Sequence, residues 1–114
     1  MNLVNFFGRK SLGTEGKDFF TTSIDFDLDT KKIVRFCVVQ LHQHKEQLFE
    51  IVKYDSAHGF CHVHRYFSAL DDKGQRLLDN QINEKSLLEF KNDVKQNWQE
   101  YKNIYLRKWP KQKV

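Results

Sequence analysis

The chain has 114 residues, of which 39% are hydrophobic and 30% are charged, and its formal net charge is +4. This length predicts one domain, residues 1–114, with a modest core to which ten Phe, four Tyr and two Trp contribute aromatic side chains. No uninterrupted apolar run is long enough to span a membrane, and the first residues lack the basic start and apolar middle of a secretory signal.

The two cysteines and the net charge indicate the cellular compartment and the kind of partner that we expect. Cys37 and Cys61 both fall in predicted strands, where a free cysteine usually acts as a small hydrophobe. We therefore expect a cytoplasmic protein without a disulfide framework and without membrane contact. The mild positive charge is compatible with an acidic or phosphate-bearing partner.

The first half of the chain predicts a sheet. Residues 1–18 combine a few apolar side chains with glycines, and we expect an apolar anchor followed by a loop. Residues 22–28 alternate strictly between apolar and polar side chains, which predicts a strand, and residues 33–42 resemble a central strand. Two more strands are predicted at 48–54 and 60–69. The short connections favour an antiparallel meander, which occupies residues 19–69 as a whole.

The second half predicts one long helix. Residues 70–82 form either a turn or a turn followed by a short strand at Gln75 to Leu78. A helix follows at 83–109, with Asn83 as its N-cap and Pro110 as its end, and residues 110–114 form a basic tail. Its apolar stripe contains Leu87, Phe90, Val94, Trp98 or Tyr101, and Tyr105. Because this helix is longer than the strands, its C-terminal end should extend past the sheet.

The predicted fold is therefore α+β, an antiparallel four-stranded meander with the long C-terminal helix packed on one face. Pairing Val52 with Val63 on the last two strands gives a sensible register and places Glu50 opposite Arg65. In that register Leu48, Glu50, Val52 and Tyr54 face the helix. The other face carries Lys53, His62, His64 and Tyr66, which Gln40 and His42 can join. A slip of one residue would exchange the two faces.

Ionisable side chains concentrate in one turn and the strand that leaves it. They are Asp55, His58, His62 and His64, with Lys53 just before the turn. Two imidazoles can act as general base and general acid near neutral pH, a carboxylate can orient one of them, and Lys53 or Arg65 can stabilise developing charge. This set suits metal-independent RNA cleavage by attack of the ribose 2′-hydroxyl. The alternative is a solvated strand face that tolerates histidines.

The same histidines allow a metal interpretation. His62 and His64, with His58 or Asp55, can supply three ligands to zinc or another divalent ion, but His-x-His alone is a weak signal and we assign no metal site or cofactor. Cys61 points away from His62 on a strand, so we expect it in the core rather than as a nucleophile.

The C-terminal segment is basic and contains a tryptophan. A basic and aromatic composition is typical of single-strand nucleic-acid contacts, and a solubilising tail is the alternative. The candidate contact residues are Arg107, Lys108, Trp109, Lys111 and Lys113.

The segment VKYDSAHGFCHVH, residues 52–64, resembles a pattern in small uncharacterised prokaryotic proteins: a strand, [R/K]-Y-D-x-A-H-G and a strand with further histidines. It is loosely similar to TumE-type toxins of toxin–antitoxin pairs, with Ser56 where those toxins carry Asn. The resemblance implies a cytosolic toxin-like protein that acts on RNA, is neutralised by an antitoxin partner, and uses Asp55, His58, His62 and His64. The alternative is a non-catalytic binding or homo-oligomerising module that uses the end of the helix and the basic tail, with Tyr105 and Trp109 packing on a second copy.

Overall fold

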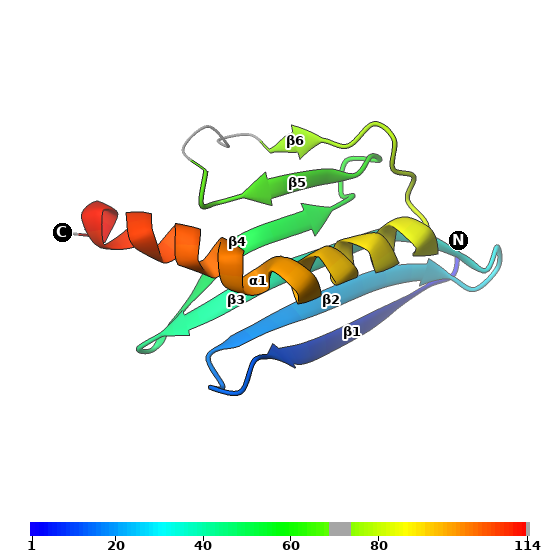
Figure 1. The fold of residues 1–114 in the computed structure, drawn as a ribbon. Helices are drawn as coiled ribbons and strands as arrows, with labels where there is room; N and C mark the ends of the chain where they lie inside the picture. The colour runs from blue at the N-terminus through cyan, green and yellow to red at the C-terminus, as the bar shows by residue number, and fades with distance from the viewer. Residues whose placement is uncertain (69–73, 114) are drawn as a thin grey trace.

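The computed structural model describes residues 1–68 and 74–113, with side chains described as far as residue 108. It confirms the α+β fold, because one long C-terminal helix packs on one face of an antiparallel sheet (Figure 1). Each strand pairs with the next one along the chain, so the strand order in the sheet equals the sequence order. The elements are β1 (Leu3–Leu12), β2 (Asp18–Asp27), β3 (Lys32–His44), β4 (Gln47–Asp55), β5 (His62–Arg65), β6 (Gln75–Arg76) and α1 (Glu84–Lys113).

The N-terminal segment is a strand, and the prediction of an apolar anchor and a loop at residues 1–18 was wrong. β1 pairs with β2 along its whole length, from Leu3 opposite Asp27 to Leu12 opposite Asp18. As an edge strand it is exposed on both faces over most of its length, so no buried face imposes an alternating pattern on its sequence. Only residues 13–17 form the connection, where Gly13 and Gly16 have positive φ angles.

A β-bulge in β4 changes which side chains face the helix. Gln40 of β3 lies opposite Val52 of β4, but the next pair is Leu41 with Glu50, so Ile51 is an extra residue. Ile51 and Val52 are both fully buried. Before the bulge the alternation is inverted, and the Phe49 ring packs near Tyr105 of α1 at 6.4 Å between ring centroids. The prediction that Leu48 and Glu50 face the helix was therefore wrong.

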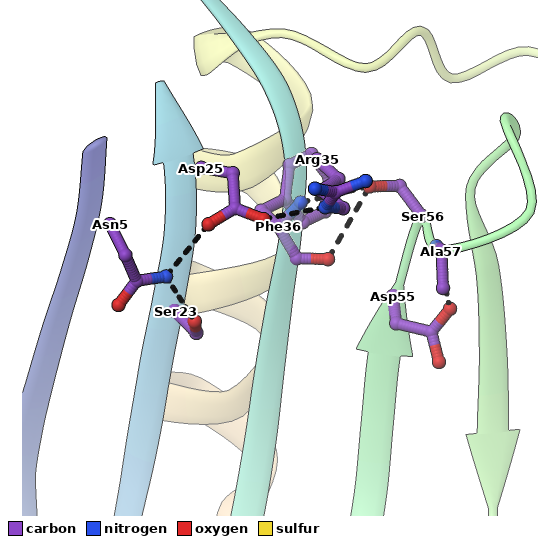
Figure 2. Close-up of polar contacts among 8 residues, drawn as sticks. All are labelled: Asn5, Ser23, Asp25, Arg35, Phe36, Asp55, Ser56 and Ala57. Carbon is purple, nitrogen blue, oxygen red and sulfur yellow. Dashed lines mark hydrogen bonds and ion pairs between the residues drawn. The ribbon is translucent and has the colours of Figure 1, made fainter. Parts of the chain in front are cut away.

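β5 pairs with β4 two residues away from the predicted register. Val63 lies opposite Tyr54 and Arg65 opposite Val52, so the predicted Glu50–Arg65 pair does not form. The cause lies in the turn, which takes up residues 56–61. Ser56 bonds back to β3: its Oγ accepts a hydrogen bond from Phe36 N at 2.9 Å, and its own N–H donates to Phe36 O at 3.1 Å (Figure 2). Because the shift is by two residues, each side chain of β5 remains on its predicted face.

The strand after β5 is short. Gln75–Arg76 form β6, which pairs Arg76 with His62, and this confirms the short-strand alternative. Most of the turn predicted at residues 71–74 and the end of the predicted strand at Ala69 lie outside the described residues. Gly74 is described and has a φ of 81°.

α1 begins as predicted, because Asn83 Oδ1 accepts a hydrogen bond from Ser86 N at 2.9 Å. Leu87, Phe90 and Val94 of the predicted stripe are buried, and the Phe90 ring stacks on Tyr54 with centroids 4.2 Å apart. The prediction that Pro110 ends the helix was wrong, because the helix continues to Lys113. The φ of proline suits a helix, and its missing N–H removes one backbone hydrogen bond. The C-terminal part of α1 extends past the sheet (Figure 1). Among the described residues, no helix combines the length and the hydropathy that crossing a membrane requires.

Candidate functional site

The sheet has one face covered by α1 and one face that the helix leaves uncovered, which we call the open face. Tyr54 contacts α1 through Phe90, so its strand neighbours Lys53 and Asp55 point to the open face. Asp55 lies opposite His62, and Lys53 opposite His64, on adjacent strands. Four of the predicted catalytic residues therefore meet across one ladder, and we call Lys53, Asp55, His62 and His64 the open-face site.

Asp55 is the centre of the open-face site. Its Oδ1 accepts a hydrogen bond from Ala57 N at 3.2 Å (Figure 2). The same oxygen lies 3.1 Å from His62 Nε2. Its Oδ2 lies 4.0 Å from Lys53 Nζ. The bond to Ala57 N fixes the carboxylate at the start of the turn, so Asp55 meets an imidazole on one side and an ammonium group on the other.

The four side chains of the open-face site differ in their exposure to solvent. The side chains of Asp55 and His62 are 11% and 9% exposed, whereas Lys53 is 33% exposed and His64 is half-buried. His62 Nδ1 is buried and lacks a hydrogen-bond partner within the described part of the chain. A buried polar atom without a partner carries a free-energy cost.

The imidazoles form a row along β5 and the turn before it. The His62 ring lies 4.9 Å from the His64 ring and 5.8 Å from the His58 ring, measured between centroids. His58 is exposed on the turn, so it flanks the site from the solvent side. Beyond His64 the Tyr66 ring stacks at 5.6 Å. All three predicted histidines therefore lie together, with His62 in the middle.

A small cavity of about 170 Å³ adjoins Lys53 and Asp55 on the open face. Its far wall is formed by Asp25, which accepts a hydrogen bond from Asn5 Nδ2 at 2.8 Å and pairs with Arg35 Nε (Figure 2). The hydrogen bond from Asn5 has the larger effect and the one from Arg35 the next largest, and together they hold the pKa of Asp25 below its usual value. The sequence prediction missed this wall; the polar side of the alternating strand, which includes Ser23 and Asp25, was the available signal.

Neither cysteine is an activated thiol. Cys37 lines the same cavity, and burial raises its pKa to about 11, so the thiol stays neutral near pH 7. Cys61 is fully buried, as predicted for a core residue, and burial raises its pKa too.

Gln40 and His42 do not join the open face, contrary to the prediction. The β3 register sends both side chains under α1, where Gln40 Nε2 donates to Trp98 O at 2.9 Å. His42 Nδ1 lies 2.8 Å from Asp18 Oδ1, and Lys102 Nζ donates to Asp18 Oδ2 at 3.1 Å. We call Asp18, His42 and Lys102 the buried triad. It lies between the sheet and α1, on the other side of the sheet from the open-face site.

The predicted nucleic-acid contacts at the C-terminus belong to α1. Arg107 and Lys108 are exposed, whereas the side chains of Trp109, Lys111 and Lys113 lie outside the described ones. Because α1 packs on the covered face, the structure does not bring these positions to the open-face site (Figure 1).

Comparison with known proteins places the chain in a family without assigning a function. No curated protein and no solved structure matches it. The family described as a domain of unknown function, DUF7718, matches residues 12–111, which spans β2 to α1 and nearly the whole chain. The chain belongs to this DUF7718 family.

Proposed function

We propose that this protein cleaves RNA at the open-face site and that its activity is toxin-like, restrained in the cell by a protein partner. One observation carries the proposal: a carboxylate, an ammonium group and two imidazoles are adjacent across the β4–β5 ladder on the uncovered face. These are the groups that phosphodiester cleavage needs when no metal takes part.

The geometry suggests a division of roles. The ribose 2′-oxygen would form a bond to phosphorus while the bond from phosphorus to the 5′-oxygen breaks. His64 and His58 are the more accessible imidazoles; one would accept the proton of the 2′-hydroxyl and the other would give a proton to the leaving 5′-oxygen. Lys53 would stabilise charge on the phosphate oxygens, and the Asp55–His62 pair would position the row of rings.

The toxin-like part of the proposal is supported by the resemblance of residues 52–64 to the TumE-type motif. The structure adds that the motif residues Asp55, His58, His62 and His64 lie close together, as one site requires. In the toxin–antitoxin pairs that the motif resembles, a partner neutralises the toxin, which is why an antitoxin-like protein belongs to the proposal.

The test is expression in a bacterial host, with growth and total RNA as readouts, and cleavage by the purified protein in EDTA. The wild type should arrest growth and degrade RNA, whereas His64→Ala and His58→Ala should do neither and should keep the wild-type unfolding temperature. His44→Ala, at the far end of β3, is the matched control and should behave as the wild type. Normal growth and intact RNA with the wild type would remove the proposal.

A second candidate is a non-catalytic binding module that uses the end of α1, and the extension of the helix past the sheet favours it (Figure 1). Tyr105 is half-buried against Phe49, so it is part of the fold rather than a free docking aromatic. A truncation should therefore begin at residue 107. This function predicts that the truncation abolishes partner capture while His58→Ala has no effect on it.

A further inference from the structure

We propose that Asp55, His62 and His64 bind one divalent transition-metal ion, for which Zn²⁺ is the natural probe. The donor atoms of these three side chains all lie within 4.8 Å of one another. Two imidazole nitrogens and one carboxylate oxygen form a donor set that zinc and its neighbours prefer, whereas magnesium and calcium prefer oxygen atoms alone.

The separation of two of these donors already fits a shared ion. Zinc bonds of about 2.0–2.2 Å in a tetrahedral arrangement place two ligand atoms about 3.3 Å apart. Asp55 Oδ1 and His62 Nε2 lie 3.1 Å apart. Both side chains are held on paired strands, so little rearrangement is needed for that part of the site. His64 is next on the same face of β5 and supplies the third ligand, which leaves a fourth position open.

The burial of His62 bears on which of its ring nitrogens can reach the ion. His62 is nine-tenths buried, and its Nδ1 has no hydrogen-bond partner within the described part of the chain. Nε2 is the nitrogen that faces Asp55 and would bind the ion, so an ion bound there would leave the cost of the unpartnered Nδ1 unchanged. The metal proposal therefore rests on the donor geometry of Asp55, His62 and His64 and on the burial of the His62 ring.

Lys53 provides a further test of the metal site. Its ammonium group lies 4.0 Å from Asp55 Oδ2, so it would lie close to the ion and repel it. Lys53→Met keeps the aliphatic part of the side chain and removes the charge. We therefore expect Zn²⁺ to bind Lys53→Met more tightly than the wild type.

The ion and the proposed RNA cleavage use the same imidazole in incompatible ways. An ion bound to His64 occupies the lone pair that would accept a proton, so Zn²⁺ should inhibit metal-independent cleavage. The metal site itself does not depend on the RNA proposal, and its test contains no RNA. A failure of one therefore leaves the other standing.

The experiment is calorimetric titration of tag-free, EDTA-dialysed full-length protein with Zn²⁺, together with thermal unfolding at each point. We expect one ion per chain and a rise in unfolding temperature. His64→Ala and Asp55→Asn should weaken binding by more than about tenfold, since loss of even an outer-shell contact to a metal site has effects of that size. His58→Ala and His44→Ala should bind as the wild type does.

Three outcomes would overturn the metal site. The first is no saturable Zn²⁺ binding to the wild type. The second is unchanged binding to the folded His64→Ala protein, which shows that the ion binds elsewhere. The third is a loss in His58→Ala as large as in His64→Ala, which shows a different ligand set. Because His64 is only half-buried, His64→Ala remains informative even if Asp55→Asn fails to fold.

Discussion

Asp55 determines what the open face can do, because its two oxygens meet different partners. A shorter or neutral side chain at this position would remove the carboxylate that contacts both His62 and Lys53. The neighbouring His64, which is more accessible, is in contact with the backbone at Gly74. The backbone at Gly74 lies against the His64 ring so closely that a Cβ built there would be 2.7 Å from His64 Cε1.

Gly74→Ala should therefore displace His64 and impair the open-face site without touching its other residues. Two effects act together, because the added methyl group meets the ring and the φ of 81° is unfavourable for alanine. We expect a loss of about 1 kcal/mol in the free energy of unfolding and a changed NMR chemical shift of the His64 ring. Gly59→Ala shares the positive φ but has open space at its Cβ, so it should destabilise without shifting His64. Unchanged His64 resonances in Gly74→Ala would contradict the contact.

At the scale of elements, α1 is fixed to the sheet by an apolar stripe and by two polar clusters. Near the middle of the helix, Asp93 accepts hydrogen bonds from Tyr54 Oη at 2.6 Å and from Tyr101 Oη at 2.8 Å. Nearer the C-terminal end of the helix, at Lys102, the buried triad joins β2, β3 and α1. Both clusters hold the helix in position on the sheet, because a shift of the helix would leave their polar groups without partners.

Asp18→Ala should destabilise the protein by about 3 kcal/mol or more, because it leaves Lys102 and His42 without their carboxylate partner between helix and sheet. Arg35→Ala is the matched control. It also breaks an ion pair, with Asp25, but the Arg35 side chain is 51% exposed and its loss should cost under about 1 kcal/mol. Urea unfolding of both variants measures the difference. Equal effects would mean that Asp18 is not a structural link between α1 and the sheet.

At the scale of the whole molecule, the two faces of one sheet carry different tasks. The covered face holds the aromatic core, including the stacked Tyr54 and Phe90 rings. The open face holds the site and the adjoining cavity. Because successive residues of a strand point to opposite faces, the same short strands β4 and β5 serve both the core and the site. Changes at the site can therefore be made without removing core side chains.

Global stability should fall steeply in alkaline solution. Burial, and then the hydrogen bond to Asp93, raises the pKa of Tyr101 from 10.0 to about 12, and the same causes raise the pKa of Tyr54 further. The unfolded chain releases these protons near pH 10 while the folded chain retains them, so the stabilisation is complete below pH 10 and is lost as the pH rises toward 12. Urea unfolding at pH 9, 10 and 11 should show this decline, and Tyr101→Phe should show a smaller one. A flat profile in the wild type would contradict the buried phenols.

The sequence by itself determined the fold class, the helix with its N-cap and the open-face location of Lys53, His62 and His64. These features depend on local periodicity, and a period of two or of 3.6 residues is visible in any single sequence. The Asn83 cap is a local contact of the same kind, since donor and acceptor are three residues apart.

Only the tertiary structure decided the features that depend on distant partners. β1 has no pattern of its own and is defined by pairing with β2. The bulge at Ile51 inverts the alternation before it, and Ser56 sets the β5 register by bonding to Phe36, twenty residues away. The same holds for Gly74 against His64 and for Asp18 beneath Lys102. A periodic pattern records which side of an element is buried, but it contains no information on what that side touches.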